Sequence, residues 1–411
     1  MNRSIDKLKQ NFKLSTSTIF CLSLFLFCSQ SVCAKNLFVS PDGKGTSARS
    51  WKTAWQTLAD INWDKVNSGD TIFIDGGIGG ITYEGPLVIP KSNIVIRQSQ
   101  ERLHSGQVII TRPNPMQVPL VATGITFNGN NVHLIGNKRS GIKVQGFSAR
   151  LVLMQSNYCS LRNIELAGVS GYPPYGQGRV ACLEYSGFYN QVINCDFRDN
   201  TRNAVEKNEP SRRNLTVFRN CTFGNKGYGF WGEFGQGIVG ADNPNSTTYL
   251  SRCVIGPYFT HGINFKSGIL IVTDSLFLGA HTANLQFSPA AGSSARVSVN
   301  RCTFYESNLT GHSIYPYSLY QVSCNGNGTM RFYNSIVYGG VVNVPAKTTI
   351  NGGGNIQFRV SGNTQALAKE IIDPRFVEDA TLSAEVTATT ILPVKWTDTS
   401  FETAAKSPAQ G

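Results

Sequence analysis

A short unit of alternating apolar and polar residues recurs seven times between Leu161 and Val337. In each unit, a pair of apolar residues flanks a polar corner residue and a small residue. Alternation of this kind is typical of a strand with one buried face, so each unit predicts two short strands that meet at a bend. The seven units are residues 161–166, 192–197, 218–223, 250–255, 272–277, 299–304 and 332–337.

Aligned on the small residue, neighbouring units lie 22 to 33 residues apart. An irregular period of this size is typical of a solenoid whose loops vary in length while its core strands do not. A further strand follows a glycine-rich turn in most repeats, as in residues 262–265 and 341–344. Three short strands per turn predict an all-β chain folded as a right-handed parallel β-helix, with one coil per repeat.

The chain before the repeats predicts a cap on the open end of this solenoid. Residues 51–61 carry apolar side chains at helical spacing, so we expect a short N-terminal capping helix there. We place the cap and first coil at residues 35–85, the β-helix at 86–360 and a C-terminal closing segment at 361–411.

Residues 1–34 predict a secretory signal peptide. Four basic residues precede an apolar run that is too short to span a bilayer, and cleavage is expected after Ala34. A lipoprotein anchor at Cys28 or Cys33 is the alternative. No later stretch approaches the ~20 apolar residues of a membrane helix. We therefore expect a secreted or periplasmic protein with no transmembrane segment in the mature chain.

Composition and charge limit the classes of molecule that this protein is expected to bind. The 41 glycines and the 15% of charged residues fit a β-solenoid with tight corners. The first 34 residues hold four of the 37 basic and one of the 25 acidic residues, so the rest of the chain keeps a net charge of +9. A basic exported protein favours an anionic polysaccharide or cell envelope, although the charge could serve solubility alone. The basic residues are scattered, which argues against nucleic acid as a partner.

Seven cysteines follow the leader. In an exported chain they suggest disulfides, and an odd number leaves at least one thiol free. Four of them, Cys195, Cys221, Cys253 and Cys302, share the small position of the repeat. We expect these four to point inward, stacked and reduced, because a buried thiol behaves as a small hydrophobe. No CxxC or His/Cys cluster suggests zinc.

Both ends of the mature chain carry a family resemblance. Residues 38–43, 51–58 and 69–72 resemble the opening of secreted pectate-lyase-like right-handed β-helix proteins. Residues 355–356, 373–377 and 406–409 resemble the segment that closes the same group. The resemblance implies the fold. The superfamily contains polysaccharide lyases, glycoside hydrolases, epimerases and non-catalytic surface proteins, so the fold alone does not select an activity.

Equivalent residues of successive coils stand about 4.8 Å apart in straight columns. Aligning the strands that follow glycine-rich turns predicts two outward columns that hold carboxylates, lysines and aromatic rings. We assign catalysis to Glu184, Glu206, Glu233 and Lys266. We assign substrate binding to a second set from the same columns: Lys143, Trp231, Asn264, Tyr315 and Tyr317.

The chemistry of these columns suits an acidic glycan. Adjacent Glu184 and Glu206 would repel each other unless a cation, a lysine or a shared proton relieves them, so the pair could bind Ca²⁺ or perform acid–base work. In uronate lyases a cation neutralises the sugar carboxylate and a basic side chain removes the adjacent proton. Lys266, or alternatively Lys143, is the candidate base.

Other interpretations stay open. Outward strand positions are commonly polar and solvated, and a register slip of one residue would turn these side chains inward. We expect a secreted lyase or hydrolase of an acidic polysaccharide. The alternatives are a non-catalytic envelope or adhesion protein that binds glycan, and a purely structural solenoid.

Overall fold

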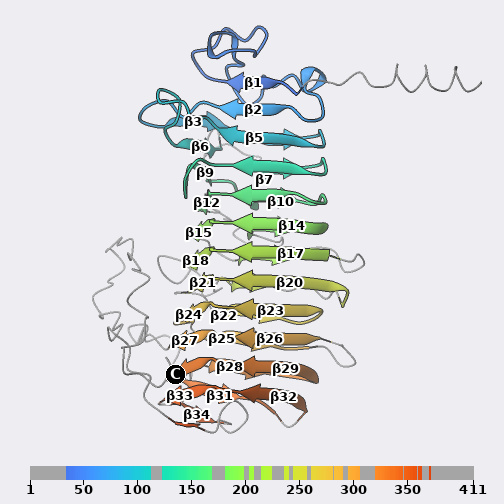
Figure 1. Ribbon diagram of the computed structural model, residues 1–411, viewed down its shortest axis with the longest axis vertical. Helices are drawn as coiled ribbons and strands as arrows, with labels where there is room; N and C mark the ends of the chain where they lie inside the picture. The colour runs from blue at the N-terminus through green and yellow to red at the C-terminus, as the bar shows by residue number, and fades with distance from the viewer. Residues whose placement is uncertain are drawn as a thin grey trace, which may run out of the picture.

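The computed structural model describes residues 34–112, 123–168, 181–198, 203–207, 214–224, 236–239, 244–256, 261–280, 282–289, 295–305, 320–345, 347–358, 360–362 and 370–371. Their strands form three long sheets, named A, B and C here, in which every pair of neighbouring strands is parallel. The chain passes repeatedly from sheet C to sheet A to sheet B, and each pass adds one coil to the stack (Figure 1). The predicted parallel β-helix is confirmed.

The strands of each sheet follow one another in chain order along the stack. Sheet A comprises β1 (Asn36–Val39), β2 (Thr71–Ile74), β5 (Ile94–Gln98), β8 (Val132–Ile135), β11 (Ser160–Arg162), β14 (Phe188–Ile193), β17 (Asn214–Arg219), β20 (Ser246–Ser251), β23 (Ile269–Thr273), β26 (Arg296–Asn300), β29 (Gly328–Tyr333) and β32 (Thr348–Gly353). Sheet B comprises β3 (Ile81–Glu84), β6 (Val108–Thr111), β9 (Ile142–Gln145), β12 (Ile164–Ala167), β15 (Asp196–Arg198), β18 (Thr222–Gly224), β21 (Val254–Ile255), β24 (Leu276–Leu278), β27 (Thr303–Tyr305), β30 (Ile336–Tyr338), β33 (Ile356–Phe358) and β35 (Glu370–Ile371). Sheet C comprises β4 (Leu87–Ile89), β7 (Thr123–Phe127), β10 (Arg150–Met154), β13 (Ala181–Tyr185), β16 (Asn203–Lys207), β19 (Gln236–Val239), β22 (His261–Phe265), β25 (Ala283–Phe287), β28 (Tyr320–Cys324), β31 (Val341–Asn343) and β34 (Ser361–Gly362).

The polar residue of the sequence repeat lies at the corner between sheets A and B. Asn163, Asn194 and Asn220 occupy it with φ of 61°, 54° and 54°, in the left-handed region. Asparagine tolerates this region better than most residues, which explains its recurrence. Arg252 and Arg301 take the same conformation at later corners, with φ of 54° and 53°.

The interior of the coil is filled by aligned apolar side chains. Along sheet C, Ile125, Val152, Leu183 and Val205 lie in register on successive strands, and each is fully buried. Aromatic rings also stack from coil to coil. The Phe277 and Phe304 centroids, for example, are 4.2 Å apart with planes inclined by only 6°. Such columns extend one core along the whole axis.

The four repeat-position cysteines behave as predicted. Cys195, Cys221, Cys253 and Cys302 are buried and free, as are the other three cysteines among the described residues. Burial raises the pKa of Cys302 to about 12, because the low-polarity interior disfavours the thiolate. These thiols are therefore packing groups.

The predicted capping helix is wrong. Residues 51–61, all of which the structure describes, contain only one 3₁₀ turn, η1 (Trp51–Thr53), and a second turn, η2 (Trp63–Lys65), follows them. The backbone of Trp55 bonds to the exposed edge of β1, with Trp55 N to Phe38 O at 3.0 Å and Ser40 N to Trp55 O at 2.8 Å. The apolar residues spaced for a helix, Trp55, Leu58 and Ile61, are instead buried over the end of the first coil.

Among the described residues, no helix has the length and apolarity needed to cross a membrane. The predicted signal peptide at residues 1–34 lies almost entirely outside the described residues, which begin at Ala34.

Candidate functional site

Sheet C contains the two glutamates that the sequence places on adjacent coils. Glu184 in β13 and Glu206 in β16 are register partners, as predicted. Neighbouring parallel strands stand about 4.8 Å apart, so the two backbones are that close at this point. The structure describes the strand register of Glu206 and not its side chain.

Glu184 differs from expectation in its environment. Its side chain is 1% exposed, although its position in the strand faces away from the core column formed by Leu183 and Tyr185. The prediction that Glu184 lies exposed at the surface is therefore wrong. Its carboxylate forms an ion pair with Arg150, at the start of β10 one coil away. A carboxylate withdrawn from water needs such a partner, because an unpaired buried charge is costly.

Arg150 is the residue of this site that sequence reasoning missed. It donates to Glu184 through Nε, and its side chain is 26% exposed. A guanidinium carries five N–H donors, so the two Nη nitrogens could bind a second anion. The contact joins residues 34 positions apart, and no periodic pattern in the sequence signals it.

Lys143 does not belong to this face. It lies in β9 of sheet B, paired in register with Glu165 of β12, and its Nζ is 3.4 Å from the Glu165 carboxylate. The glycine-rich stretch before β9 links sheet A to sheet B in this coil, whereas the turns used for the alignment precede sheet C strands. Leu153 occupies the column position next to Glu184 instead.

The alignment of Trp231, Glu233, Tyr315 and Tyr317 is also wrong in register. These four residues lie outside the described ranges, and the strands of sheet C are formed by later segments, β19 and β28. Val239 of β19 stands between Glu206 and Asn264, and Ser323 of β28 follows Gln286. Loops of unequal length before these strands displaced the alignment.

Asn264 and Lys266 extend the face toward the C-terminus. Asn264 in β22 is half-buried and in register with Gln286 of β25, as predicted. Lys266 follows β22 and is exposed. Two coils separate β16 from β22, so about 10 Å lies between the coils of Glu206 and Lys266, and about 14 Å between those of Glu184 and Lys266.

The described side chains do not form a calcium site. Across the described ranges, no three His, Cys, Asp or Glu side chains gather as metal ligands. Ca²⁺ prefers six to eight oxygen ligands, and Arg150 already supplies positive charge beside Glu184. Calcium binding by Glu184 and Glu206 stays a prediction.

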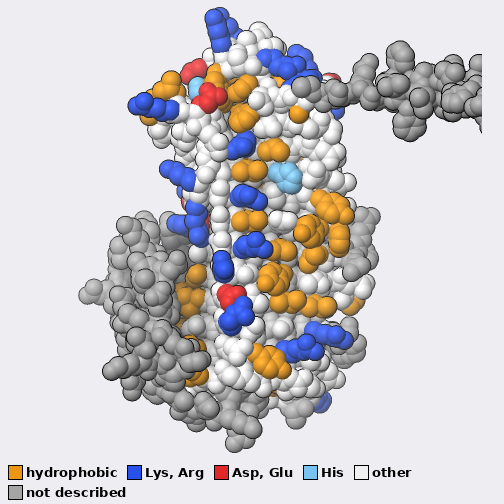
Figure 2. All heavy atoms as spheres, viewed as in Figure 1, with side chains coloured by type: hydrophobic (Ala, Val, Ile, Leu, Met, Phe, Trp, Pro, Cys, Tyr) orange, Lys and Arg blue, Asp and Glu red, His pale blue; other side chains and the backbone are white. Residues whose placement is uncertain are grey.

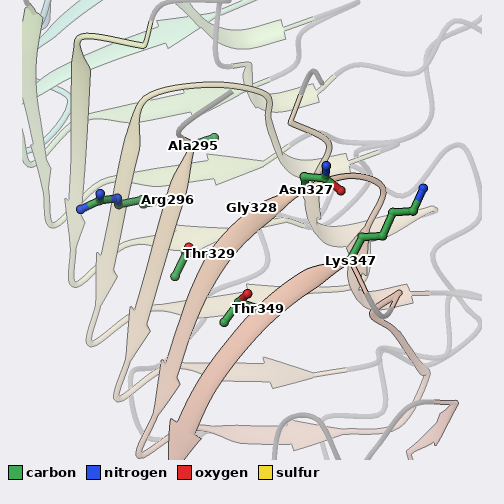
Figure 3. Close-up of a pocket in the computed structure, with 7 residues that line it drawn as sticks. All are labelled: Ala295, Arg296, Asn327, Gly328, Thr329, Lys347 and Thr349. Atoms are coloured by element: carbon green, nitrogen blue, oxygen red, sulfur yellow. The ribbon is translucent and has the colours of Figure 1, made fainter. Parts of the chain in front are cut away.

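The hollow drawn in Figure 3 lies on a different face, at the beginnings of β26, β29 and β32 in sheet A. It measures about 600 Å³, and its lining includes Arg296, Thr329, Lys347 and Thr349. Figure 3 shows Arg296 and Lys347 extending away from each other on its two sides. The lining contains no carboxylate, so the hollow offers no acid–base pair.

Comparison with known proteins identifies the fold. No protein-family model matches the sequence, and no curated protein does. Among solved structures, pectate lyase Pel9A is similar with a TM-score of 0.52 and 14% identity, over 92% of this chain and 91% of that one. A rhamnogalacturonan lyase is similar with a TM-score of 0.50 and 13% identity, over 84% of this chain and 91% of that one. This chain has a parallel β-helix fold similar to the folds of these two lyases.

At these identities the likeness concerns the fold, and the activity has to be argued from the residues themselves. The opening segments that suggested the pectate-lyase-like fold contribute β1 and the start of β2. The closing segments at residues 373–377 and 406–409 lie outside the described residues.

Proposed function

We propose that this protein is a secreted or periplasmic lyase that cleaves an acidic polysaccharide on the outward face of sheet C. The observation that carries the proposal is the register pair Glu184–Glu206, with Arg150 bound to Glu184. A row of charged and polar groups along a straight coil axis suits a linear polymer better than a small molecule. Lyases among the solved structures of this fold add support.

Burial of Glu184 favours elimination over hydrolysis. Glycosidases commonly use two carboxyl groups that both reach the glycosidic bond, about 5–10 Å apart. A carboxylate that is buried and bound by arginine is poorly placed for that task. In the proposed scheme, Glu184 positions Arg150, and the Nη nitrogens of Arg150 bind a carboxylate of the polymer at one end of the site.

The elimination step takes place between Glu206, whose carboxylate would orient the sugar through its hydroxyl groups, and Lys266. Their backbones lie about 10 Å apart along the axis, a span that two long side chains can close around one sugar unit. In this scheme Lys266 takes the proton from the ring carbon that bears the carboxylate. The released electron pair forms a double bond to the next ring carbon, whose bond to the glycosidic oxygen breaks. The leaving oxygen takes a proton from water.

The remaining assignments complete the proposal. Asn264 would donate or accept hydrogen bonds with sugar hydroxyls from the middle of the face. Roles for Glu233, Trp231, Tyr315 and Tyr317 stay predictions. Export rests on the leader of residues 1–34, and N-terminal sequencing of the exported protein is expected to begin at Lys35.

The test is a panel of uronate polysaccharides, with and without Ca²⁺, read by ultraviolet absorbance of unsaturated ends and by reducing ends. Elimination produces both signals, whereas hydrolysis produces reducing ends alone. We expect Glu206→Gln and Lys266→Met to abolish both signals. Glu84→Gln and Lys347→Met, matched exposed residues away from sheet C, should keep full turnover. Full turnover in Glu206→Gln would remove Glu206 from the mechanism.

A second candidate is a non-catalytic glycan-binding protein of the envelope. It is favoured by the neutral Glu184–Arg150 pair and by the lack of a three-ligand acidic cluster among the residues described. Retention of wild-type protein on acidic glycan, combined with no cleavage of any member of the panel, would put this function first.

A further inference from the structure

Sheet A differs from the other two sheets in its charge. None of its twelve strands contains Asp or Glu, whereas sheets B and C each contain acidic residues such as Glu165 and Glu184. The same twelve strands contain five arginines, Arg97, Arg162, Arg219, Arg296 and Arg331. The outward face of sheet A is therefore cationic along its length.

Three of these arginines form one straight column. Arg97, Arg162 and Arg219 lie in register on alternate coils, with Ile135 and Ile193 on the coils between them. Figure 2 shows this alternation of blue and orange side chains down the middle of the face. Parallel strands are about 4.8 Å apart, so the arginines repeat about every 10 Å along the axis. We call Arg97, Ile135, Arg162, Ile193 and Arg219 together the arginine column.

The charges of the column are not neutralised within the described part of the chain. No ion pair there joins Arg97, Arg162 or Arg219 to a carboxylate. Arg162 and Arg219 are exposed. The Arg97 guanidinium lies 5.8 Å from the ring centroid of Phe73, and its buried Nε lacks a hydrogen-bond partner.

The acid beyond the C-terminal end of the column is already paired. Asp274 accepts hydrogen bonds from Arg301 Nε at 2.6 Å and from Arg301 Nη2 at 3.0 Å. Its charge is thus offset locally, and the column keeps its positive potential. An uncompensated row of arginines attracts anions, and the planar guanidinium is suited to bidentate binding of carboxylate or sulfate.

We propose that the arginine column is a second binding surface, for an acidic polysaccharide chain that lies along the helix axis. Anionic groups of the polymer pair with Arg97, Arg162 and Arg219. The apolar faces of the intervening sugars rest on Ile135 and Ile193, which are half-buried. Sheet A and sheet C are separate sides of the coil, so a polymer could be held on one while another segment is cleaved on the other.

The spacing of the arginines and the aliphatic residues between them favour a glycan over nucleic acid as the ligand. Single-stranded nucleic acid is commonly held by aromatic rings on which successive bases stack, whereas the residues between these arginines are aliphatic. Duplex DNA presents phosphates every 3.4 Å per strand along a curved path, which a straight row with a ~10 Å repeat does not follow.

The test compares two variants of equal charge. Arg162→Gln/Arg219→Gln removes the exposed part of the column. Arg296→Gln/Arg331→Gln removes two other arginines of the same sheet that are also exposed. Affinity electrophoresis through polygalacturonate, heparin and neutral dextran supplies the apparent Kd. We expect the column variant to lose about 10-fold in affinity for the acidic polymers, and the control variant to lose less than about 3-fold. Neither should bind dextran.

The outcomes separate the possibilities. If the two variants lose the same affinity for the acidic polymers, net charge alone explains the binding and the arginine column is not a specific site. No loss in either would remove sheet A as a binding surface. Tighter binding of single-stranded DNA or of phosphatidylserine vesicles than of either polysaccharide would overturn the partner class. Melting temperatures should match the wild type, because all four replaced side chains are exposed.

The proposed lyase activity is tested independently. Cleavage of a short oligouronate, too short to span both sheets, should be unchanged in Arg162→Gln/Arg219→Gln. Glu206→Gln should retain polymer binding while losing cleavage. If the wild type cleaves nothing, the binding comparison still decides whether the arginine column is real.

Discussion

Asp196 is the best-connected carboxylate of the described structure, and its replacement gives a sharp test of the packing between coils. It lies in β15 on the outward side of sheet B, yet it is only 1% exposed. Arg139 donates to it through Nε at 3.0 Å and Nη2 at 2.6 Å, and Ser140 Oγ at 3.0 Å. Thr222 of β18 donates as well. The network therefore joins coils on both sides of Asp196.

The expected cost of Asp196→Asn follows from these contacts. The amide retains the shape but loses the charge that strengthens each hydrogen bond. Removing one partner of a fully buried ion pair costs about 3–5 kcal/mol. The Arg139 side chain is 46% exposed and regains water, so we expect a smaller loss, about 2–3 kcal/mol at pH 7.

The sign of the pH dependence is fixed by the pKa. Burial alone would raise the pKa of Asp196, but the hydrogen bonds from Arg139 and Thr222 and the charges of Arg139 and Arg198 outweigh it and lower the pKa. A carboxyl whose folded pKa is lowered stabilises the protein above its unfolded pKa, about 3.9. That stability is lost as the pH falls through the folded value.

Asp274→Asn is the matched control. Asp274 also pairs with an arginine, but both side chains are exposed, and the pair is worth about 0.2–1 kcal/mol. Its φ of 51° suits asparagine. Thermal and denaturant unfolding at pH 7 and at pH 3 would measure both variants. The reasoning fails if Asp196→Asn costs no more than the control, or if its cost at pH 3 equals that at pH 7.

Two further changes test the corners of the coil. Cys221→Ser should lower the free energy of unfolding by only about 1 kcal/mol, the low end for a buried hydroxyl. The reason is that Ser275, at the same repeat position, donates a hydrogen bond to the carbonyl of Thr273 at 2.8 Å. Denaturant unfolding measures this loss, and a loss above about 3 kcal/mol would contradict the prediction. Tyr158→Asn should raise the free energy of unfolding by about 1 kcal/mol, because Tyr158 is 51% exposed and holds φ at 59°, where Asn131 holds 54° one coil earlier. A variant less stable than the wild type would show that Tyr158 is not strained.

The corner between sheets A and B was predictable because its causes are local. A residue that tolerates the left-handed region is followed by a small buried residue, as in Asn194 and Cys195. Both requirements fall on consecutive positions, so the sequence displays them at the corners that follow β14, β17, β20, β23, β26 and β29. The short connections also keep the strands of sheet A in a constant relation to those of sheet B.

The register of sheet C was only partly predictable because its causes are distant. Connections from sheet B vary from residues 199–202 to residues 306–319, so a glycine-rich turn is no fixed distance from the strand that follows. Glu184 and Glu206 were paired correctly because the segment between them is short. Lys143 was misplaced because its turn leads to sheet B. The buried Glu184 is paired with Arg150, 34 residues earlier, and no local pattern in the sequence shows that contact.

The same difference in connections separates the two proposed surfaces. Sheet A leads into sheet B through corners as short as residues 194–195 and 220–221, so its outward residues repeat at the strand spacing with little freedom. A rigid, regular row suits the binding of a regular polymer, and the arginine column uses it. Sheet C is preceded by long, variable segments, and loops of that kind commonly carry catalytic and specificity groups on a rigid scaffold. Chemistry on sheet C and attachment on sheet A would thus each use the face whose construction suits it, and the variants Glu206→Gln and Arg162→Gln/Arg219→Gln should separate the two in one set of measurements.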